Sequence, residues 1–195
     1  MPASAASSDE DLMIAYAAGD AAAFDTLYAR HKGGVYRYLL RQCRHDGVAD
    51  ELFQDVWMNL IRAHTGYAPT AKFTTWLYRL AHNRLVDHYR ASGVVTLVSA
   101  DDEAHVVVVA AIAADCGDDP NARAENRELG ERLKSAVATL PPAQREAFLL
   151  HQEGGLSLAE IAELTGVGVE TVKSRLRYAT NKLRSDLSDL YEPQR

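Results

Sequence analysis

The sequence predicts an all-α protein made of two small helical domains joined by a flexible linker. Apolar residues recur mostly at three- and four-residue spacing from residue 9 to residue 91, and again from residue 122 onward. This spacing is typical of amphipathic helices. The segment between them, Gly93–Asp119, lacks helical periodicity and mixes valines with clusters of acids. It is too long for an ordinary connection within a compact domain, so we interpret it as an interdomain linker.

Domain boundaries follow from these changes of pattern. The small, polar residues 1–8 are expected to be disordered, and the tail at residues 190–195 to fray. The first domain then takes residues 9–92, the linker residues 93–121, and the second domain residues 122–189.

Two helices open the first domain. The first, Asp9–Ala18, has acids in its first turn, where the helix dipole favours them. The second, Ala21–Cys43, has an apolar row but contains Gly33 and Gly34. Because paired glycines weaken a helix, we expect a bend or a weak turn there.

A third helix is predicted at Val48–His64, after a turn at Asp46-Gly47. Its apolar residues point inward, while its outer face is rich in acids and amides. Such a face is usually just solvated, and the sharper interpretation is a docking surface for another protein. The residues of this outer face are Asp50, Glu51, Gln54 and Asp55.

A fourth helix, Phe73–Ala91, follows a loop at Thr65–Lys72. Aromatic residues alternate with arginines along it, a pattern that suits single-stranded nucleic acid because bases stack on rings while cations follow phosphates. A buried Trp76 with solvated arginines is the alternative interpretation. The residues concerned are Phe73, Trp76, Tyr78, Arg79, Arg84, Tyr89 and Arg90.

The second domain is predicted to contain four further helices. Pro120 suits the first position of a helix that continues over Ala122–Leu140, and Pro141-Pro142 stops it. The next helix is Ala143–Gln152. It is expected to pack beneath the pair of helices that follows.

That last pair, within Gly154–Arg184, reads as a helix-turn-helix. Ser157 is an N-cap with Glu160 in the capping-box position, and the glycines of Thr165–Gly168 end the first helix. Any αα-hairpin could share these features. However, the outer face of the second helix offers side chains that can contact base edges or phosphates. These are Lys173, Ser174, Arg177, Tyr178 and Asn181, with Arg175 toward the flank.

The bulk composition narrows the function classes. The net charge of −6 argues against a nonspecific polyanion binder, although Val172–Arg184 holds five bases and no acid. Cys43 and Cys116 lie far apart, and the histidines lack ligand spacing, so neither a disulfide nor a metal site is indicated. No apolar run is long enough for a membrane helix and no secretory signal opens the chain. We expect a cytoplasmic protein without membrane insertion.

Four stretches in this order resemble bacterial RNA polymerase sigma factors of the extracytoplasmic-function type. DLMIAYAAGDAAAFDTLYARH is similar to the start of their region 2, and VADELFQDVWMNLIRA to the segment that docks on core polymerase. FTTWLYRLAHNRLVDHYR is similar to the promoter-melting helix. The stretch from Leu140 to Arg184 is similar to region 4.

The resemblance implies roles for residues in each stretch. Core polymerase, through the clamp helices of its largest subunit, would meet Asp50, Glu51, Gln54 and Asp55. The minus-10 element would meet Tyr67, Trp76, Arg79, Asn83 and Arg84, with Tyr67 and Asn83 holding a flipped base and Trp76 chiefly structural. The minus-35 element would meet Lys173, Ser174, Arg175, Arg177, Tyr178 and Asn181.

The resemblance also implies partners: core RNA polymerase, promoter DNA and an anti-sigma factor. No catalytic residue, metal or cofactor is implied, and the chain would not be an enzyme. Two features depart from the family. Many relatives carry Arg at the position of Tyr178, so a minus-35 preference does not transfer, and the valine-rich run in the linker is unusual.

Two other functions compete with this interpretation. A response-regulator-type transcription factor shares this kind of helix-turn-helix, but it would need an α/β receiver where residues 9–91 show four helical patterns. A hydrolase or nuclease using Asp87 and His88 would need a metal-ligand set, a nucleophile elbow or a phosphate loop. None of these motifs is present in the sequence.

Overall fold

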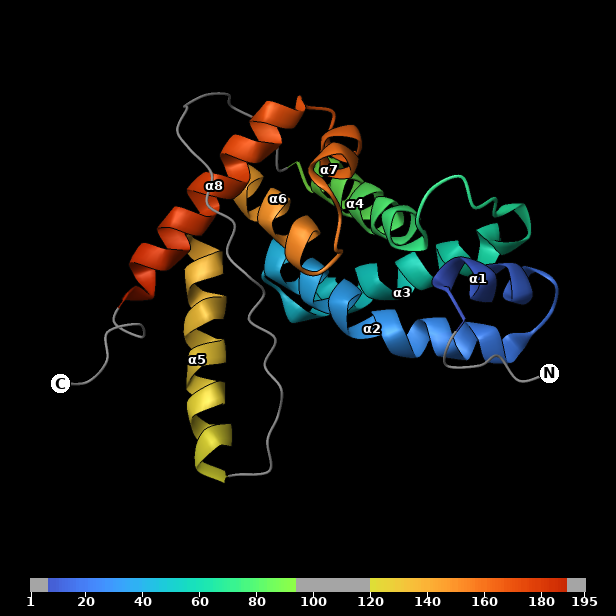
Figure 1. The fold of residues 1–195 in the computed structure, drawn as a ribbon, viewed down its shortest axis with the longest axis horizontal. Helices are drawn as coiled ribbons and strands as arrows, with labels where there is room; N and C mark the ends of the chain where they lie inside the picture. Colours follow the sequence, from blue (N-terminus) through green and yellow to red (C-terminus); the bar gives the residue numbers. More distant parts are fainter. Residues whose placement is uncertain (1–6, 94–119, 189–195) are drawn as a thin grey trace.

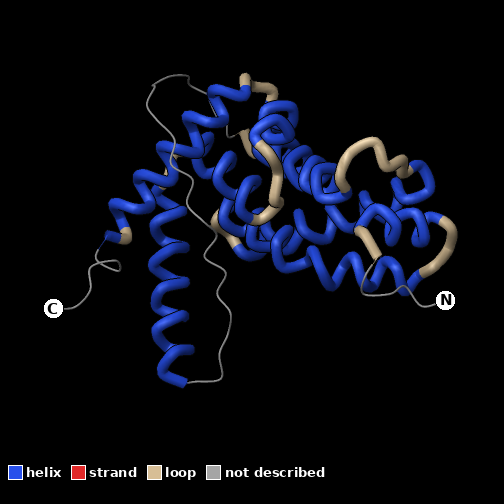
Figure 2. Tube along the Cα trace, viewed as in Figure 1, coloured by secondary structure: helices blue, strands red, loops and turns tan. Residues whose placement is uncertain are grey.

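The computed structural model describes residues 7–93 and 120–188, the latter with side chains from Gly130 onward. Within these ranges the regular elements are helices joined by turns, and no strand occurs (Figure 2). The all-α prediction is therefore confirmed. The expectations for residues 1–6, for nearly all of the linker with its valine-rich run, and for the tail fall outside the described residues.

The first domain holds four α-helices and one short 3₁₀ helix. Large buried side chains from all four α-helices form its core, among them Leu12, Leu39, Leu60 and Leu77. The elements are α1 (Asp9–Ala17), α2 (Ala21–Cys43), α3 (Asp46–Ala63), η1 (His64–Gly66) and α4 (Phe73–Ala91).

The second domain also holds four helices. Pro120 begins α5 as predicted, and α6 begins at Pro142, one residue before the predicted start at Ala143. Apolar side chains including Leu149 and Val172 are fully buried between the helices. The elements are α5 (Pro120–Thr139), α6 (Pro142–Gln152), α7 (Leu158–Thr165) and α8 (Val169–Asp186).

The glycines Gly33 and Gly34 do not interrupt the second helix, and the bend or weak turn expected there stays a prediction. The helix α2 continues through both glycines, with Val35 and Tyr38 fully buried in the turn that follows. Burial of this apolar face outweighs the roughly 1 kcal/mol per residue that glycine costs in a helix.

The turn predicted at Asp46-Gly47 lies slightly earlier in the chain. Arg44 ends α2 in the left-handed conformation, at φ 58°. The helix α3 then begins at Asp46, because the Nδ1 atom of His45 accepts a hydrogen bond from the backbone N–H of Val48 at 3.4 Å.

The two domains are packed against each other. Figure 1 shows α6 against the C-terminal half of α2 and α7 beside α4, and both pairs of helices are in contact. Tyr78 of α4 is 1% exposed and donates its hydroxyl to the backbone carbonyl of Glu153 at 2.7 Å. The helix-turn-helix therefore lies directly on the first domain.

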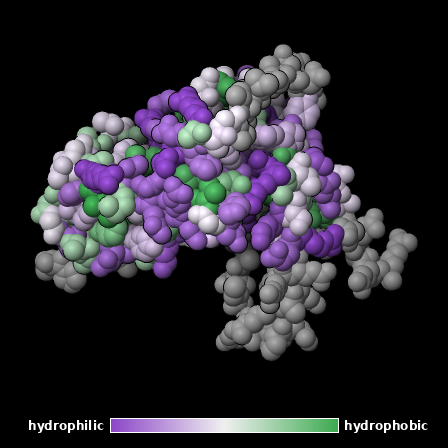
Figure 3. Space-filling model, turned by 180° about the vertical axis from the view of Figure 1, so that it is seen from behind, coloured by the Kyte–Doolittle hydropathy of each residue, from purple (hydrophilic) through white to green (hydrophobic). Residues whose placement is uncertain are grey.

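Among the described helices, none has both the length and the apolar character needed to cross a lipid bilayer. Figure 3 shows the face opposite to that of Figure 1 as mainly hydrophilic, with apolar patches separated by polar side chains. Large hydrophobic side chains exposed among the described residues are Ile14, Met58 and Val169.

Candidate nucleic-acid and protein interfaces

The predicted helix-turn-helix is present as α7 and α8. Ser157 and Glu160 form a reciprocal capping box, in which each side chain accepts from the backbone N–H of the other residue, at 3.3 Å and 2.8 Å. Gly166 ends α7 in the left-handed conformation at φ 71°. These local signals were readable from the sequence and fix both ends of the short helix.

The carboxyl group of Glu160 is stabilised in its charged form. Hydrogen bonds from Ser157 and then from Thr75 of α4 lower the pKa of Glu160 to about 2. Thr75 donates to Glu160 at 2.6 Å across the contact between the two domains. The capping box is thus shared between the helix-turn-helix and the first domain.

Ser157→Ala is expected to lower the free energy of unfolding by about 1 kcal/mol, because it removes the cap of α7. The pKa of Glu160 should rise from about 2 toward its ordinary value of 4.5, since its first hydrogen-bond donor is lost. A carboxyl group whose pKa is lowered by folding stabilises the folded state at pH values above 4.5, and this stabilisation is lost as the pH falls to about 2. The difference in unfolding free energy between wild type and Ser157→Ala should therefore become smaller over this pH range. Carboxyl NMR titration measures this pKa, and a Glu160 pKa that stays near 2 in the variant contradicts it.

The outer face of α8 agrees only partly with the sequence prediction. Lys173 and Asn181 are exposed, Ser174 and Tyr178 are half-buried, and Lys173 lies 3.4 Å from Glu170. The expectation that Arg177 projects outward is wrong for this conformation, because the residue is only 7% exposed. Its guanidinium lies over the ring of Tyr178, 5.0 Å from the centroid.

Arg175 and Arg177 are both enclosed, but only Arg177 has a buried side-chain nitrogen without a hydrogen-bond partner among the described residues. Arg175, expected at the flank, is 9% exposed. The Nη2 atom of Arg177 is buried without a hydrogen-bond partner among the described residues. A buried donor without a partner is costly, so Arg177 can gain an acceptor when a ligand binds.

Aromatic side chains gather at the start of α4. Tyr67 lies against Trp76 with ring centroids 5.1 Å apart, and Trp76 lies 6.0 Å from Phe73, which is fully buried. Burial, followed by Glu10 and Asp9, raises the pKa of Tyr67. Its hydroxyl is buried and has no partner among the described residues. This cluster offers an aromatic surface together with an unused hydroxyl group.

The remaining predicted residues of α4 lie further along the helix. Asn83 is exposed and follows Trp76 by seven residues, which is about 10 Å along the helix axis. Arg79 is exposed and lies 2.6 Å from Glu163 of α7. The structure thus brings Tyr67 and Trp76 together, with Asn83 two turns beyond them on the same helix.

The acidic face of α3 presents Asp50, Glu51 and Gln54 to solvent. Asp55 instead accepts from the Nε of Arg84 at 2.7 Å, so a predicted docking residue and a predicted DNA contact are paired. A hydrogen bond to Asp50 raises the pKa of Tyr36.

Met58 is a residue of the α3 face that sequence reasoning missed. It is 46% exposed and follows Gln54 by four residues, which puts both on one side of the helix. The sequence signal that could have identified it is an apolar residue four positions after Gln54, on a helix face that is otherwise polar. An exposed methionine beside acids and amides is the kind of surface that docks on another protein.

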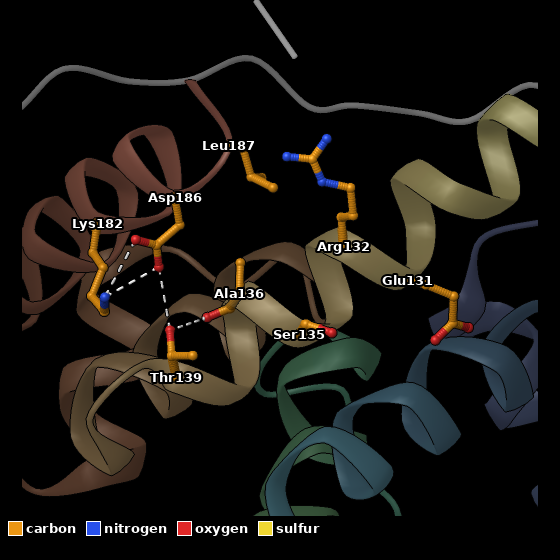
Figure 4. A pocket seen from close by; sticks show the side chains of 8 residues that line it. All are labelled: Glu131, Arg132, Ser135, Ala136, Thr139, Lys182, Asp186 and Leu187. Atoms are coloured by element: carbon orange, nitrogen blue, oxygen red, sulfur yellow. Dashed lines mark hydrogen bonds and ion pairs between the residues drawn. The ribbon is translucent and has the colours of Figure 1, made fainter. Parts of the chain in front are cut away.

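A groove of about 640 Å³ lies between α5 and the C-terminal end of α8 (Figure 4). Lys182 and Thr139 both hydrogen-bond to the carboxylate of Asp186, at 3.1 Å and 3.3 Å. None of the predicted site residues lines this groove. The polar groups of Thr139, Lys182 and Asp186 contact one another, and we assign the groove no ligand.

Candidate metal ligands do not gather in the described part of the chain. No group of three His, Cys, Asp or Glu side chains there is arranged to hold a metal ion. Asp87 is exposed, and His88 packs its ring 5.8 Å from that of Tyr89. The arrangement therefore gives no support to a metal-dependent nuclease.

Comparison with known proteins identifies both helical domains. Residues 27–94 match the family model "Sigma-70 region 2", and residues 130–183 match "Sigma-70, region 4". The chain is 30% identical to the RNA polymerase sigma factor CarQ of Myxococcus xanthus over 86% of this chain and 91% of CarQ. It is also 30% identical to the ECF RNA polymerase sigma factor SigK of Mycobacterium tuberculosis, over 93% and 95% of the two chains.

A solved structure resembles the fold over most of its length. It is the sigma factor RpoE in complex with the anti-sigma factor NepR from Bartonella quintana, with a TM-score of 0.61 and 21% identity. The match covers 85% of this chain and 96% of that one. The likeness supports the same helical architecture.

Proposed function

The chain belongs to the extracytoplasmic-function sigma factors of the sigma-70 family, and we propose from this how its residues divide the work of transcription initiation. The observation that carries the proposal is the order of two family-matched domains, region 2 and then region 4, with a capped helix-turn-helix in the second. The response-regulator alternative is not supported, because the described part of the first domain is helical and matches region 2.

The proposed division of labour has no chemical step in this chain. Region 4, in residues 122–189, binds the double-stranded minus-35 element, and region 2, in residues 9–92, binds single-stranded minus-10 bases. Core RNA polymerase supplies the polymerisation chemistry, and the assembly works in the cytoplasm. This chain contributes binding energy, which offsets the few kcal/mol needed to flip a base out of the duplex.

Core-polymerase docking is assigned to the exposed face of α3. Asp50, Glu51 and Gln54 supply polar contacts, and Met58 supplies an apolar one. Asp55 contributes through its ion pair with Arg84, which connects the docking face to the DNA-binding helix α4.

Minus-10 recognition is assigned to the aromatic cluster and to Asn83. The half-buried rings of Tyr67 and Trp76 provide a surface at the start of α4, and the unpartnered hydroxyl of Tyr67 is available to a base. Asn83 is exposed and has both a donor and an acceptor for a base edge. Arg79 and Arg84 lie on the same helix and follow the phosphates.

Minus-35 recognition is assigned to α8. Arg175 and Arg177 are enclosed in this structure and would have to turn outward to reach DNA, and we expect their substitutions to have different effects. Arg177→Ala should cost about 1–3 kcal/mol and relax preference at one base pair, because it removes a bidentate contact with guanine. Arg175→Ala should weaken all sequences similarly and flatten the log–log salt dependence by about one unit. Binding-site selection with core polymerase carrying each variant in turn measures the base preference of Arg175→Ala and of Arg177→Ala. A base preference that changes with Arg175→Ala but not with Arg177→Ala contradicts this orientation of α8.

An anti-sigma factor is the further partner we propose. The structurally similar sigma factor RpoE was solved in complex with the anti-sigma factor NepR. A partner of this kind would regulate the present chain by covering its polymerase- and DNA-binding faces.

The assignment of function is tested by mixing the full chain with purified core RNA polymerase and separating the products by gel filtration. Co-elution of the chain with core polymerase at equal stoichiometry is expected. A chain that elutes separately at micromolar concentrations would contradict the proposal.

A further inference from the structure

The helix α1 lies outside the part of the chain that matches region 2, because that match begins at residue 27. Its inner side is anchored in the core of the first domain, where Leu12 is 1% exposed and Met13 is fully buried. No residue of α1 is among those assigned to DNA or to core polymerase. Its contacts with the residues around Tyr67 nevertheless connect it to the surface assigned to minus-10 bases.

Glu10 of α1 caps the start of α4 from a distant part of the chain. The first backbone N–H groups of a helix have no partner within the helix, and Lys72, at the N-cap position of α4, makes no side-chain cap. Instead, the Oε1 atom of Glu10 accepts from the backbone N–H of Phe73 at 2.7 Å. A carboxylate at this end also lies where the helix dipole favours negative charge. The first residue of α4 is therefore tied to α1.

A second contact of α1 holds the other end of the loop that carries Tyr67. The ring of Tyr16 lies 4.7 Å from the ring of His64, measured between centroids. His64 begins the 3₁₀ helix η1, which leads directly into Tyr67. Together with the hydrogen bond between Glu10 and Phe73, this contact ties both ends of the loop to one helix.

The helix α1 is itself tied to α2 by the neighbouring residue Asp9. The carboxylate of Asp9 accepts from Arg30 at 2.7 Å and lies 2.7 Å from the Nε2 atom of His31. The His31 ring packs 5.2 Å from that of Phe73, measured between centroids. Movement of α1 along α2 would therefore break contacts on both sides of Glu10.

Tyr67 is the residue whose position these contacts determine. Its ring lies 5.1 Å from that of Trp76, and its hydroxyl is buried without a hydrogen-bond partner among the described residues. A hydrogen-bonding group selects between ligands well only when supporting residues hold it within about 0.5 Å of the productive position. The loop needs such support from outside, and α1 supplies it at both ends.

We propose that Glu10 and Tyr16 are positioning residues for the recognition of a minus-10 base, because they hold both ends of the loop that presents the Tyr67 hydroxyl. This inference rests on the proposed function, which assigns Tyr67 to a flipped base. Neither residue touches DNA, and each acts through the loop. Their loss should therefore change base selection and leave the docking of core polymerase on α3 intact.

Glu10→Ala tests the cap, with Glu10→Gln as its matched control. Alanine removes the acceptor, whereas the amide oxygen of glutamine can still accept from the Phe73 N–H. NMR hydrogen exchange on the full chain should show about fivefold faster exchange of the Phe73 amide in Glu10→Ala, the effect of losing one helix cap, and little change in Glu10→Gln. Asp11→Asn, at an exposed position of the same helix, should also leave this exchange unchanged.

Base selection supplies the second measurement. Core polymerase carrying each variant is mixed with a single-stranded DNA library that contains about eight randomised bases, and the retained strands are sequenced. Glu10→Ala should relax the preference at one position and weaken binding about fivefold, while Glu10→Gln stays near wild type. Tyr16→Leu keeps an apolar side chain beside Phe24 and should relax the preference at the same position.

Three outcomes overturn the proposal. Unchanged exchange of the Phe73 amide in Glu10→Ala shows that the cap does not hold α4. A base preference unchanged in both Glu10→Ala and Tyr16→Leu shows that the loop selects a base without these contacts. Equal losses in Glu10→Ala and Glu10→Gln show an effect of charge and not of the cap. Failure of the proposed function would appear differently, as wild-type protein that does not bind core polymerase or shows no base preference in the library.

Discussion

Glu51→Arg combined with Gln54→Ala is expected to weaken binding to core RNA polymerase at least about tenfold, the effect of losing a central interface contact. Both residues are exposed on α3, while the buried side of the same helix holds Leu52, Val56 and Leu60 in the core. The substitutions therefore change the docking face without touching the packing. Pull-down titration with core polymerase measures the affinity, and circular dichroism should show unchanged helix content.

Asp25→Arg is the control for the charge reversal. Asp25 is exposed on α2, outside the assigned docking face, and the change also adds a positive charge to region 2. It should leave the affinity for core polymerase within about twofold of wild type, as expected for a rim position. Equal loss of affinity in both variants would show a nonspecific charge effect, and no loss in either would remove the docking assignment.

Asn83→Ala is expected to spare binding to core polymerase and to reduce open-complex formation about ten- to a hundredfold, because an unpaired base loses its hydrogen bonds to the Asn83 amide. Asn83 is exposed on α4, so the substitution leaves the core of region 2 intact. Permanganate footprinting of unpaired thymines measures the opening directly.

Asp87→Asn on the same helix is the matched control for Asn83→Ala. Asp87 is exposed one turn further along α4, and the substitution keeps the shape of the side chain. Opening near the wild-type level is expected for it. If Asn83→Ala opens DNA as well as Asp87→Asn does, then Asn83 is only a helix-surface residue.

Local signals in the sequence were sufficient to predict where most of the described helices begin and end. Ser157 marks the start of α7 through its capping hydrogen bonds, and Gly166 marks its end through its left-handed conformation. Both signals lie within a few residues of the helix. Such signals depend on neighbours in sequence, so they are readable without a structure. The apolar spacing of α3 likewise predicted the buried positions Leu52, Val56 and Leu60.

Features that depend on distant residues could not be predicted in this way. Gly34 was predicted only to bend or weaken its helix, whereas the structure shows that a Cβ there would meet the Tyr78 hydroxyl and the carbonyl oxygen of Glu153. The sequence likewise gave no sign that Arg84 pairs with Asp55.

The orientation of Arg177 is a further case. Its position in the helical repeat predicted an outward side chain, yet the guanidinium folds over the ring of the next residue, Tyr178. Periodicity places a Cα atom on a face, but the rotamer of a long side chain depends on what surrounds it.

Run-off transcription with core RNA polymerase over a genomic promoter library measures directly whether this protein directs transcription initiation. Adding this protein should produce discrete transcripts that core polymerase alone does not make, and their start sites should share common minus-35 and minus-10 sequences. Transcripts identical to those of core polymerase alone, with a chain that binds core polymerase normally, would contradict it.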